Sequence, residues 1–160
     1  IYSIKRMAGE LYLAGEQGLL GHLNPQTQRF DRLELPYKGS LFGMAGNQDS
    51  IWVYGLRGNL FRTHDQGKNW LQVPTGVSGA LTASTVGSQG EVSIVSLSGQ
   101  LISISPSHGP GTESSSNSEP QVSLIKLNQP AAAVLALSEG YVIGGLRGLT
   151  SSVFTAEQGK

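Results

Sequence analysis

The sequence of 160 residues contains no cysteine and little charge, and both absences exclude classes of function. Without cysteine the chain has neither disulfides nor thiolate metal sites, and it suits the cytosol and the periplasm equally. Its 11 basic residues balance 11 acidic ones, so the composition favours neither nucleic acid nor an acidic membrane surface as a partner. No apolar run approaches the length of a membrane-spanning helix, so we expect at most a peripheral contact with membranes.

Glycine, in contrast, is abundant, and part of it marks an internal repeat. Four segments join an alternating apolar run to a small residue and a Gly turn: LYLAGEQGLL, IWVYGLRGNL, VSIVSLSGQL and YVIGGLRGLT. The small residues that anchor them recur about every 40 residues. These anchors are Gly15, Gly55, Ser96 and Gly145. The longest interval includes residues 105–121, which are rich in Ser, Gly and Pro, and we predict a mobile loop there.

Each repeat is expected to contribute strands and tight turns. A short apolar run, a turn signal and the alternating run indicate strand, turn, strand, Gly turn and strand. The only segment with a plausible helical composition is PAAAVLALSEG, residues 130–140, and its place in the repeat favours a strand instead. A period near 40 residues with three or four short strands is typical of β-propeller blades, and a β-solenoid is the main alternative.

We therefore predict an all-β chain that forms a β-propeller of about four blades, each of three to four antiparallel strands. The predicted blades are residues 1–39, 40–80, 81–128 and 129–160. Alternating apolar side chains should fill the cores between blades, and Trp52 and Tyr54 should join them. The alternating positions are Leu11, Leu13, Ile51, Val53, Val92, Ile94, Tyr141 and Ile143.

The segment THDQGKNW, Thr63–Trp70, looks like an Asp box, the turn motif of BNR-repeat propellers. In this motif Thr63 opens the turn, and Asp65 would accept hydrogen bonds from its backbone N–H groups. Gly67 would supply a positive φ angle, and Trp70 would begin the next strand and wedge between blade layers. We interpret these four residues as structural. Weaker copies are LNPQTQRF, residues 23–30, and TAEQGK, residues 155–160.

Gly-Leu-Arg-Gly occurs in the second and fourth repeats, and its combination with an Asp box resembles the photosystem II stability/assembly factor-like family of BNR propellers. The resemblance covers all four repeats. It implies a periplasmic or otherwise exported protein without catalytic activity or cofactor, which binds or assembles a membrane-associated complex. Its partner would be a protein, such as a subunit of that complex or a component of a transporter. Family members form seven-bladed rings, so a chain of four blades that opens on Ile1 is expected to be the C-terminal part of a longer protein.

Arg57 and Arg147 are the candidate partner-binding residues, together with Gln17 and Ser98 at the matching positions of the other two repeats. We expect both Gly-Leu-Arg-Gly segments to form the same turn, with the arginines on one face of the propeller. Two interpretations stay open. The guanidinium groups could clamp carboxylates or carbonyls of a partner, or they could staple their turns to carbonyls of neighbouring blades. Arginine-rich surface patches in the resembled family favour the clamp.

The alternative function is a sialidase-like glycoside hydrolase or a carbohydrate-binding propeller, because sialidases share Asp boxes. Such an enzyme needs three arginines, a Tyr paired with a Glu, and an Asp acid/base. The three aspartates, Asp31, Asp49 and Asp65, lie in polar turn or rim contexts, and no Tyr/Glu pair stands out. No metal site is predicted either, because the three histidines lack ligand spacing.

An incomplete ring leaves the faces of its first and last blades uncovered. We therefore predict that the chain meets a second copy, or further chain, through the edges near Ile1–Leu13 and Val142–Phe154.

Overall fold

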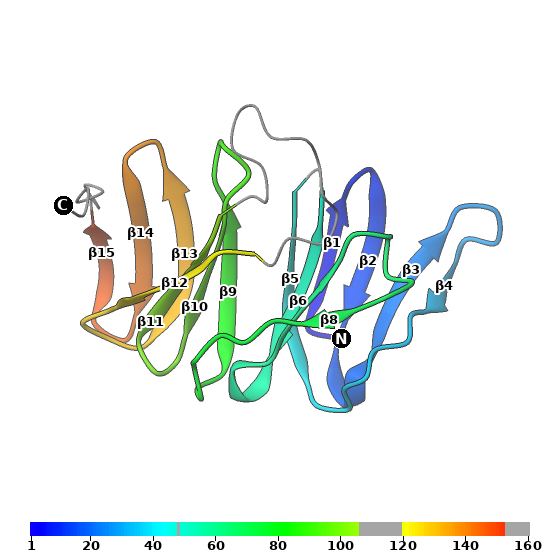
Figure 1. The fold of residues 1–160 in the computed structure, drawn as a ribbon, viewed down its shortest axis with the longest axis horizontal. Coiled ribbons are helices and arrows are strands. Elements are labelled where there is room, and N and C mark those ends of the chain that lie inside the picture. Colours follow the sequence, from blue (N-terminus) through cyan, green and yellow to red (C-terminus); the bar gives the residue numbers. More distant parts are fainter. Residues whose placement is uncertain (48, 106–119, 153–160) are drawn as a thin grey trace.

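The computed structural model describes residues 1–47, 49–105 and 120–152. They form four antiparallel sheets of four, four, four and three strands, each built from consecutive strands (Figure 1). The first sheet contains β1 (Ser3–Met7), β2 (Glu10–Ala14), β3 (Leu20–Asn24) and β4 (Arg29–Arg32). The second contains β5 (Leu41–Gly46), β6 (Ile51–Gly55), β7 (Leu60–Thr63) and β8 (Leu71–Gln72). The third contains β9 (Leu81–Val86), β10 (Val92–Ser96), β11 (Gln100–Ile104) and β12 (Val122–Lys126), and the fourth β13 (Ala131–Leu137), β14 (Gly140–Gly145) and β15 (Gly148–Ser152).

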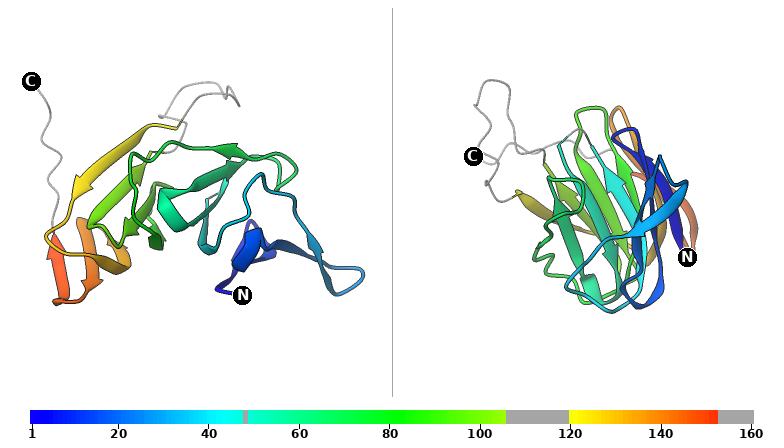
Figure 2. Two further views of the ribbon diagram at one scale, coloured as in Figure 1. Left: turned by 90° about the horizontal axis from the view of Figure 1, so that it is seen from below. Right: turned by 90° about the vertical axis from the view of Figure 1, so that its right-hand side faces the viewer.

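The four sheets fan out along an arc and do not close into a ring (Figure 2). The first strands of the sheets, β1, β5, β9 and β13, lie side by side along this arc, and each packs against the first strand of the next sheet. This is the arrangement of propeller blades, so the predicted all-β partial propeller is confirmed. Residues 130–140 are confirmed as non-helical, because β13 occupies Ala131–Leu137. The helical segments of the described part are two single 3₁₀ turns, η1 (Glu16–Gly18) and η2 (Leu56–Gly58), and neither has the length or apolarity to cross a membrane.

The core lies between neighbouring sheets. Every residue of β6 and of β10 is buried, because each of these strands is covered by a sheet on both faces. Burial therefore extends beyond the predicted alternation and includes Trp52 and Tyr54. Of the eight alternating positions, Leu11 and Tyr141 are half-buried and the others are buried.

Hydroxyl groups join the second, third and fourth sheets. Thr82 Oγ1 on β9 donates to the carbonyl of Ala131 on β13 at 2.7 Å. Ser84 Oγ, also on β9, donates to the carbonyl of Met44 at 3.1 Å and accepts from the Tyr54 hydroxyl at 2.9 Å. Burial raises the pKa of Tyr54 to about 12, although its bond to Ser84 acts in the opposite direction. β9 therefore holds both of its neighbouring sheets by polar bonds as well as by apolar packing.

The two ends of the arc carry uncovered apolar side chains. Ile4 on β1 is 55% exposed, and Leu135 and Leu149 on the last sheet are 58% and 78% exposed. By contrast, Val134 and Ile143 in that same sheet pack toward the third sheet. Association of a second copy or of further chain through these end faces stays a prediction.

Three sequence predictions concern residues outside the described part of the chain. The predicted mobile loop falls mostly on residues 106–119, and the TAEQGK copy and Phe154 fall on residues 153–160. The described ends of the loop meet, because the Ser105 N–H donates to the Gln121 carbonyl at 3.1 Å.

Candidate functional site

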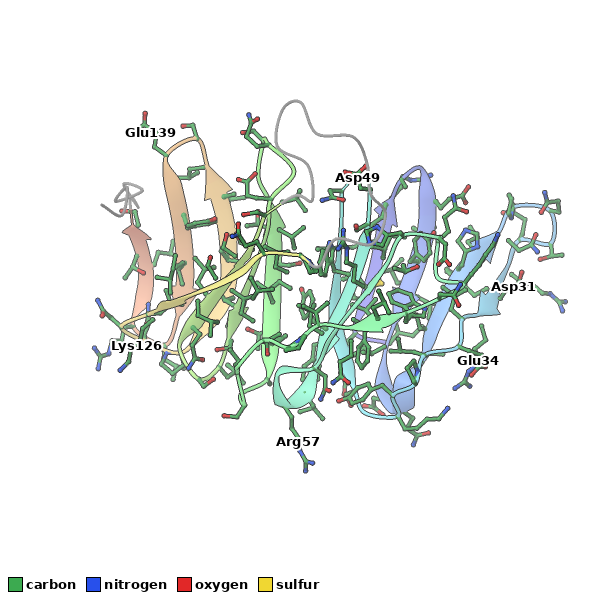
Figure 3. The ribbon with its side chains drawn as sticks, viewed as in Figure 1. Asp31, Glu34, Asp49, Arg57, Lys126 and Glu139 are labelled. Carbon is green, nitrogen blue, oxygen red and sulfur yellow. The ribbon has the colours of Figure 1, made fainter. Side chains whose placement is uncertain are left out.

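The turns between the second and third strands of all four sheets lie at one end of the molecule, which we call the arginine end (Figure 1). Arg57 lies in the β6–β7 turn and Arg147 in the β14–β15 turn. Gln17 and Ser98 occupy the corresponding turns of the first and third sheets, and all four residues are exposed. Figure 3 shows Arg57 directed away from the body of the protein at this end, with Asp49 and Glu139 at the opposite end. The four candidate residues therefore share one end but belong to four different sheets.

The two Gly-Leu-Arg-Gly segments form different turns, so the prediction of one shared conformation was wrong. Arg57 has φ 57° and ψ 35°, Gly58 has φ 69°, and the Asn59 N–H donates to the Leu56 carbonyl at 3.2 Å. These angles describe a type I′ turn. In the second segment only Gly148 has positive φ, so Arg147 keeps an ordinary right-handed or extended backbone. The two turns also have different surroundings, since at the first turn the Thr75 hydroxyl donates to the Gly58 carbonyl at 2.9 Å.

Neither guanidinium group forms a hydrogen bond or an ion pair with any described residue. Only the backbone of Arg147 is bonded, through its N–H to Oε1 of Gln129 at 2.8 Å. A staple would require each guanidinium to be buried against carbonyls of a neighbouring sheet, whereas both side chains are exposed. The described geometry therefore favours the clamp over the staple.

The backbone of Arg57 carries a conformational cost that Arg147 does not. A left-handed backbone costs a non-glycine residue about 1 kcal/mol, and Gly or Asn normally occupies the first central position of a type I′ turn. We therefore expect Arg57→Gly to raise the free energy of unfolding by about 0.5–1 kcal/mol. The same change at Arg147 should give no gain, because there glycine only adds freedom to the unfolded chain. Urea unfolding of both variants measures this difference, and equal effects would contradict the two turn assignments.

A pocket of about 300 Å³ opens beside Arg147, between the third and fourth sheets. Lys126 at the end of β12 and Arg147 supply two cationic side chains to its lining. Gln129, which is 6% exposed, lies in the connection from β12 to β13 and also lines it. Sequence reasoning missed Lys126 and Gln129. They lie near residue 147 only through the packing of sheets, and neither belongs to a motif.

The turn between β7 and β8 has the bonding expected of its sequence. Asp65 accepts the Asn69 N–H at 2.9 Å and the Thr63 hydroxyl at 2.7 Å. The Gly67 N–H donates to Thr63 Oγ1 at 3.0 Å, and Nε1 of Trp70 donates to the Gly67 carbonyl at 3.1 Å. Gly67 has φ 92°. These residues close a turn and support the core of the first two sheets, against which Trp70 packs.

The same turn perturbs the acidity of its aspartate. Partial burial acts to raise the pKa of Asp65, but hydrogen bonds from the Asn69 backbone, the Thr63 hydroxyl and the Asn69 side chain outweigh it. The pKa of Asp65 falls from 3.8 to about 2 as a result.

Of the elements of a sialidase site, one Tyr–Glu pair does form in the described part of the chain, because the Tyr2 hydroxyl donates to Oε1 of Glu16. The three aspartates make no hydrogen bond to this pair. Asp65 is committed to its turn, and Asp31 on β4 accepts the side chain of Asn24 at 2.8 Å. Asp49 lies at the end opposite Arg57 (Figure 3).

One serine–histidine contact was not foreseen from the sequence. Nδ1 of His64 lies 3.1 Å from Ser50 Oγ and 3.0 Å from the Asp49 carbonyl. Ser50 Oγ also accepts Nε of Arg62 at 3.0 Å, and the Arg62 guanidinium lies 5.0 Å from the Trp52 ring centre. When Nδ1 donates to the Asp49 carbonyl it cannot accept the serine proton, so this contact braces two strands.

Within the described residues no three His, Cys, Asp or Glu side chains gather as a metal site would require.

No family model and no curated protein sequence matches the chain. Solved structures do match it. A catalytically inactive variant of virginiamycin B lyase from Staphylococcus aureus, with Quinupristin, has a TM-score of 0.67 and 13% identity over 98% of this chain and 56% of its own. The structure of YCF48 bound to D1 peptide has a TM-score of 0.52 and 17% identity over 89% of this chain and 49% of its own. The chain therefore spans about half the length of these proteins, and at such identities the likeness establishes the propeller fold.

Proposed function

We propose that this chain is part of a non-catalytic β-propeller that binds a protein partner through its arginine end. The observation that carries the proposal is the state of Arg57 and Arg147, which are exposed at one end and leave their guanidinium groups unbonded among the described residues. A guanidinium group presents five N–H donors in a planar fork, which suits carboxylates and backbone carbonyls of another protein. Arg57 is also kept in a backbone conformation that costs stability.

The comparison with YCF48 supports the class of ligand, since that propeller was solved with a peptide bound. The finer parts of the proposal come from the sequence resemblance. They are a seven-bladed ring, an exported or periplasmic location, and a role in assembling a membrane-associated complex. The virginiamycin B lyase neighbour is an enzyme on the same fold, so fold alone does not select between binding and catalysis.

Changing Arg57 and Arg147 together to alanine should weaken binding and leave the fold intact. Peptide ligands would first be selected on the unmodified chain from a random display library, and their affinities then measured by calorimetry. Each charge-assisted hydrogen bond lost should cost about 1.5–3 kcal/mol, which is about tenfold to a hundredfold in Kd. The melting temperature should stay almost unchanged, because no described residue bonds to these groups.

The matched control is the double variant Arg29→Ala and Lys68→Ala, which removes two exposed cations away from the arginine end. It has the same net charge as the test variant, so a general electrostatic effect would weaken binding equally in both. Equal losses would contradict a binding site at the arginine end. A fall in melting temperature without loss of binding would instead establish the staple.

A further inference from the structure

We propose that the pocket beside Arg147 receives an acidic side chain of the partner, an aspartate or glutamate within an extended segment. This inference rests on the proposed function and assigns a ligand chemistry to one part of the arginine end. The pocket has a volume of about 300 Å³, which lies at the lower limit of small-ligand sites and suits one or two side chains. Among the described residues its charged lining is Lys126 and Arg147, and none of those that line it is acidic.

The two cations come from different sheets, and packing between the sheets fixes their spacing. Lys126 ends β12 and is exposed at the same end as Arg57 (Figure 3). Arg147 is positioned by Gln129, whose Oε1 accepts the Arg147 N–H at 2.8 Å and whose Nε2 donates to the Gly148 carbonyl at 3.5 Å. Because Gln129 is buried and bonded at both ends of its amide, the turn that carries Arg147 is held on the pocket rim.

The remaining lining decides between an acidic side chain and a larger anion. Asn128 and Ser151 add neutral polar groups, whereas Leu127 and Ile143 supply apolar surface. A carboxylate with its methylene groups satisfies both kinds of lining, since the head meets the cations and the stem meets the apolar surface. A dianionic phosphate could use the same donors, but it has no apolar stem and gains nothing from the apolar walls. An acidic residue next to an apolar one is therefore the segment that this pocket fits best.

The probe is the peptide acetyl-Ala-Leu-Glu-Ala-amide, compared with its neutral isostere acetyl-Ala-Leu-Gln-Ala-amide. Both are titrated into the ¹⁵N-labelled chain, and the side-chain resonances of Gln129 and Arg147 are followed. The glutamate peptide should shift these resonances and bind about tenfold more tightly than the glutamine peptide. Lys126→Met and Arg147→Leu should each remove most of this preference. Lys68→Met, which removes an exposed cation away from the arginine end, should change the Kd less than twofold.

Equal binding of the two peptides, or equal losses in the Lys68 and Arg147 variants, would overturn the pocket assignment. A phosphoserine peptide that binds more tightly than the glutamate peptide would assign the pocket to phosphate and would also overturn it. The NMR spectra report whether each variant stays folded, so a lost signal is not mistaken for a lost ligand. Library peptides that still require both arginines while the glutamate probe fails would leave the proposed function standing and reject the pocket alone.

Discussion

Replacing Gly58 with alanine is expected to lower the free energy of unfolding by about 3 kcal/mol or more, whereas the same change at Gly148 should cost about 1 kcal/mol. Both glycines end a Gly-Leu-Arg-Gly segment and both have positive φ, at 69° and 92°. A Cβ at Gly58 would overlap the carbonyl oxygen of Val77, which belongs to the backbone and cannot turn aside. A Cβ at Gly148 would meet no atom within 4 Å, so only the left-handed backbone is penalised there.

Chemical denaturation of the two single variants, monitored by tryptophan fluorescence, measures this difference. Gly148→Ala is the matched control, because it makes the same chemical change in the same motif. A large loss at both positions would mean that the β14–β15 turn is as tightly packed as the β6–β7 turn. A small loss at both would show that the chain near Val77 moves away easily.

Asp65→Ala is expected to cost about 2–3 kcal/mol, because it removes the acceptor for three donors at once. The Asn69 N–H, the Asn69 amide and the Thr63 hydroxyl all bond to this carboxylate. In Asp65→Asn the side chain keeps one carbonyl oxygen as an acceptor, so we expect a smaller loss. Thermal unfolding of the three proteins at neutral pH gives this order, and equal stability of the alanine variant and the unmodified chain would contradict it.

The lowered pKa of Asp65 also predicts how the free energy of unfolding depends on pH. Its pKa is lower in the folded chain, about 2, than the ordinary value of 3.8. Its contribution is therefore complete above pH 3.8 and is lost as the pH falls toward 2. Since Asp65 is partly exposed, solvent screening reduces this contribution to about 1 kcal/mol. The difference in stability between the unmodified chain and Asp65→Asn should shrink over this pH range, and a constant difference would show that the hydrogen bonds do not depend on the charge.

The propeller was predictable because each repeat encodes its own strands and turns. The spacing of Gly15, Gly55, Ser96 and Gly145 marked the sheets, and its place in the repeat identified β13 as a strand although its composition is helical. The Thr63–Trp70 turn was equally readable, since its bonds join residues within the motif. Membership of the chain in the BNR family stays a prediction.

The turn conformations and the pocket could not be predicted in this way. The two Gly-Leu-Arg-Gly segments have identical letters, but their backbones depend on the chain that packs against them. At Gly58 that chain is the connection near Thr75 and Val77. The pocket is lined by Lys126 and Arg147, which belong to two different sheets, so no local sequence pattern indicates it.

The order of the strands has a consequence for how the chain folds. Each sheet consists of consecutive strands, and its contacts with other sheets run mainly to its neighbours in sequence. Such a linear array behaves like a repeat protein, in which folding starts at any stable pair of units and spreads outward. The second and third sheets, joined through β9, lie in the middle of the arc and each has a neighbouring sheet on both sides. They should act as the folding nucleus of the arc, and the first and fourth sheets should be the last to form and the first to open.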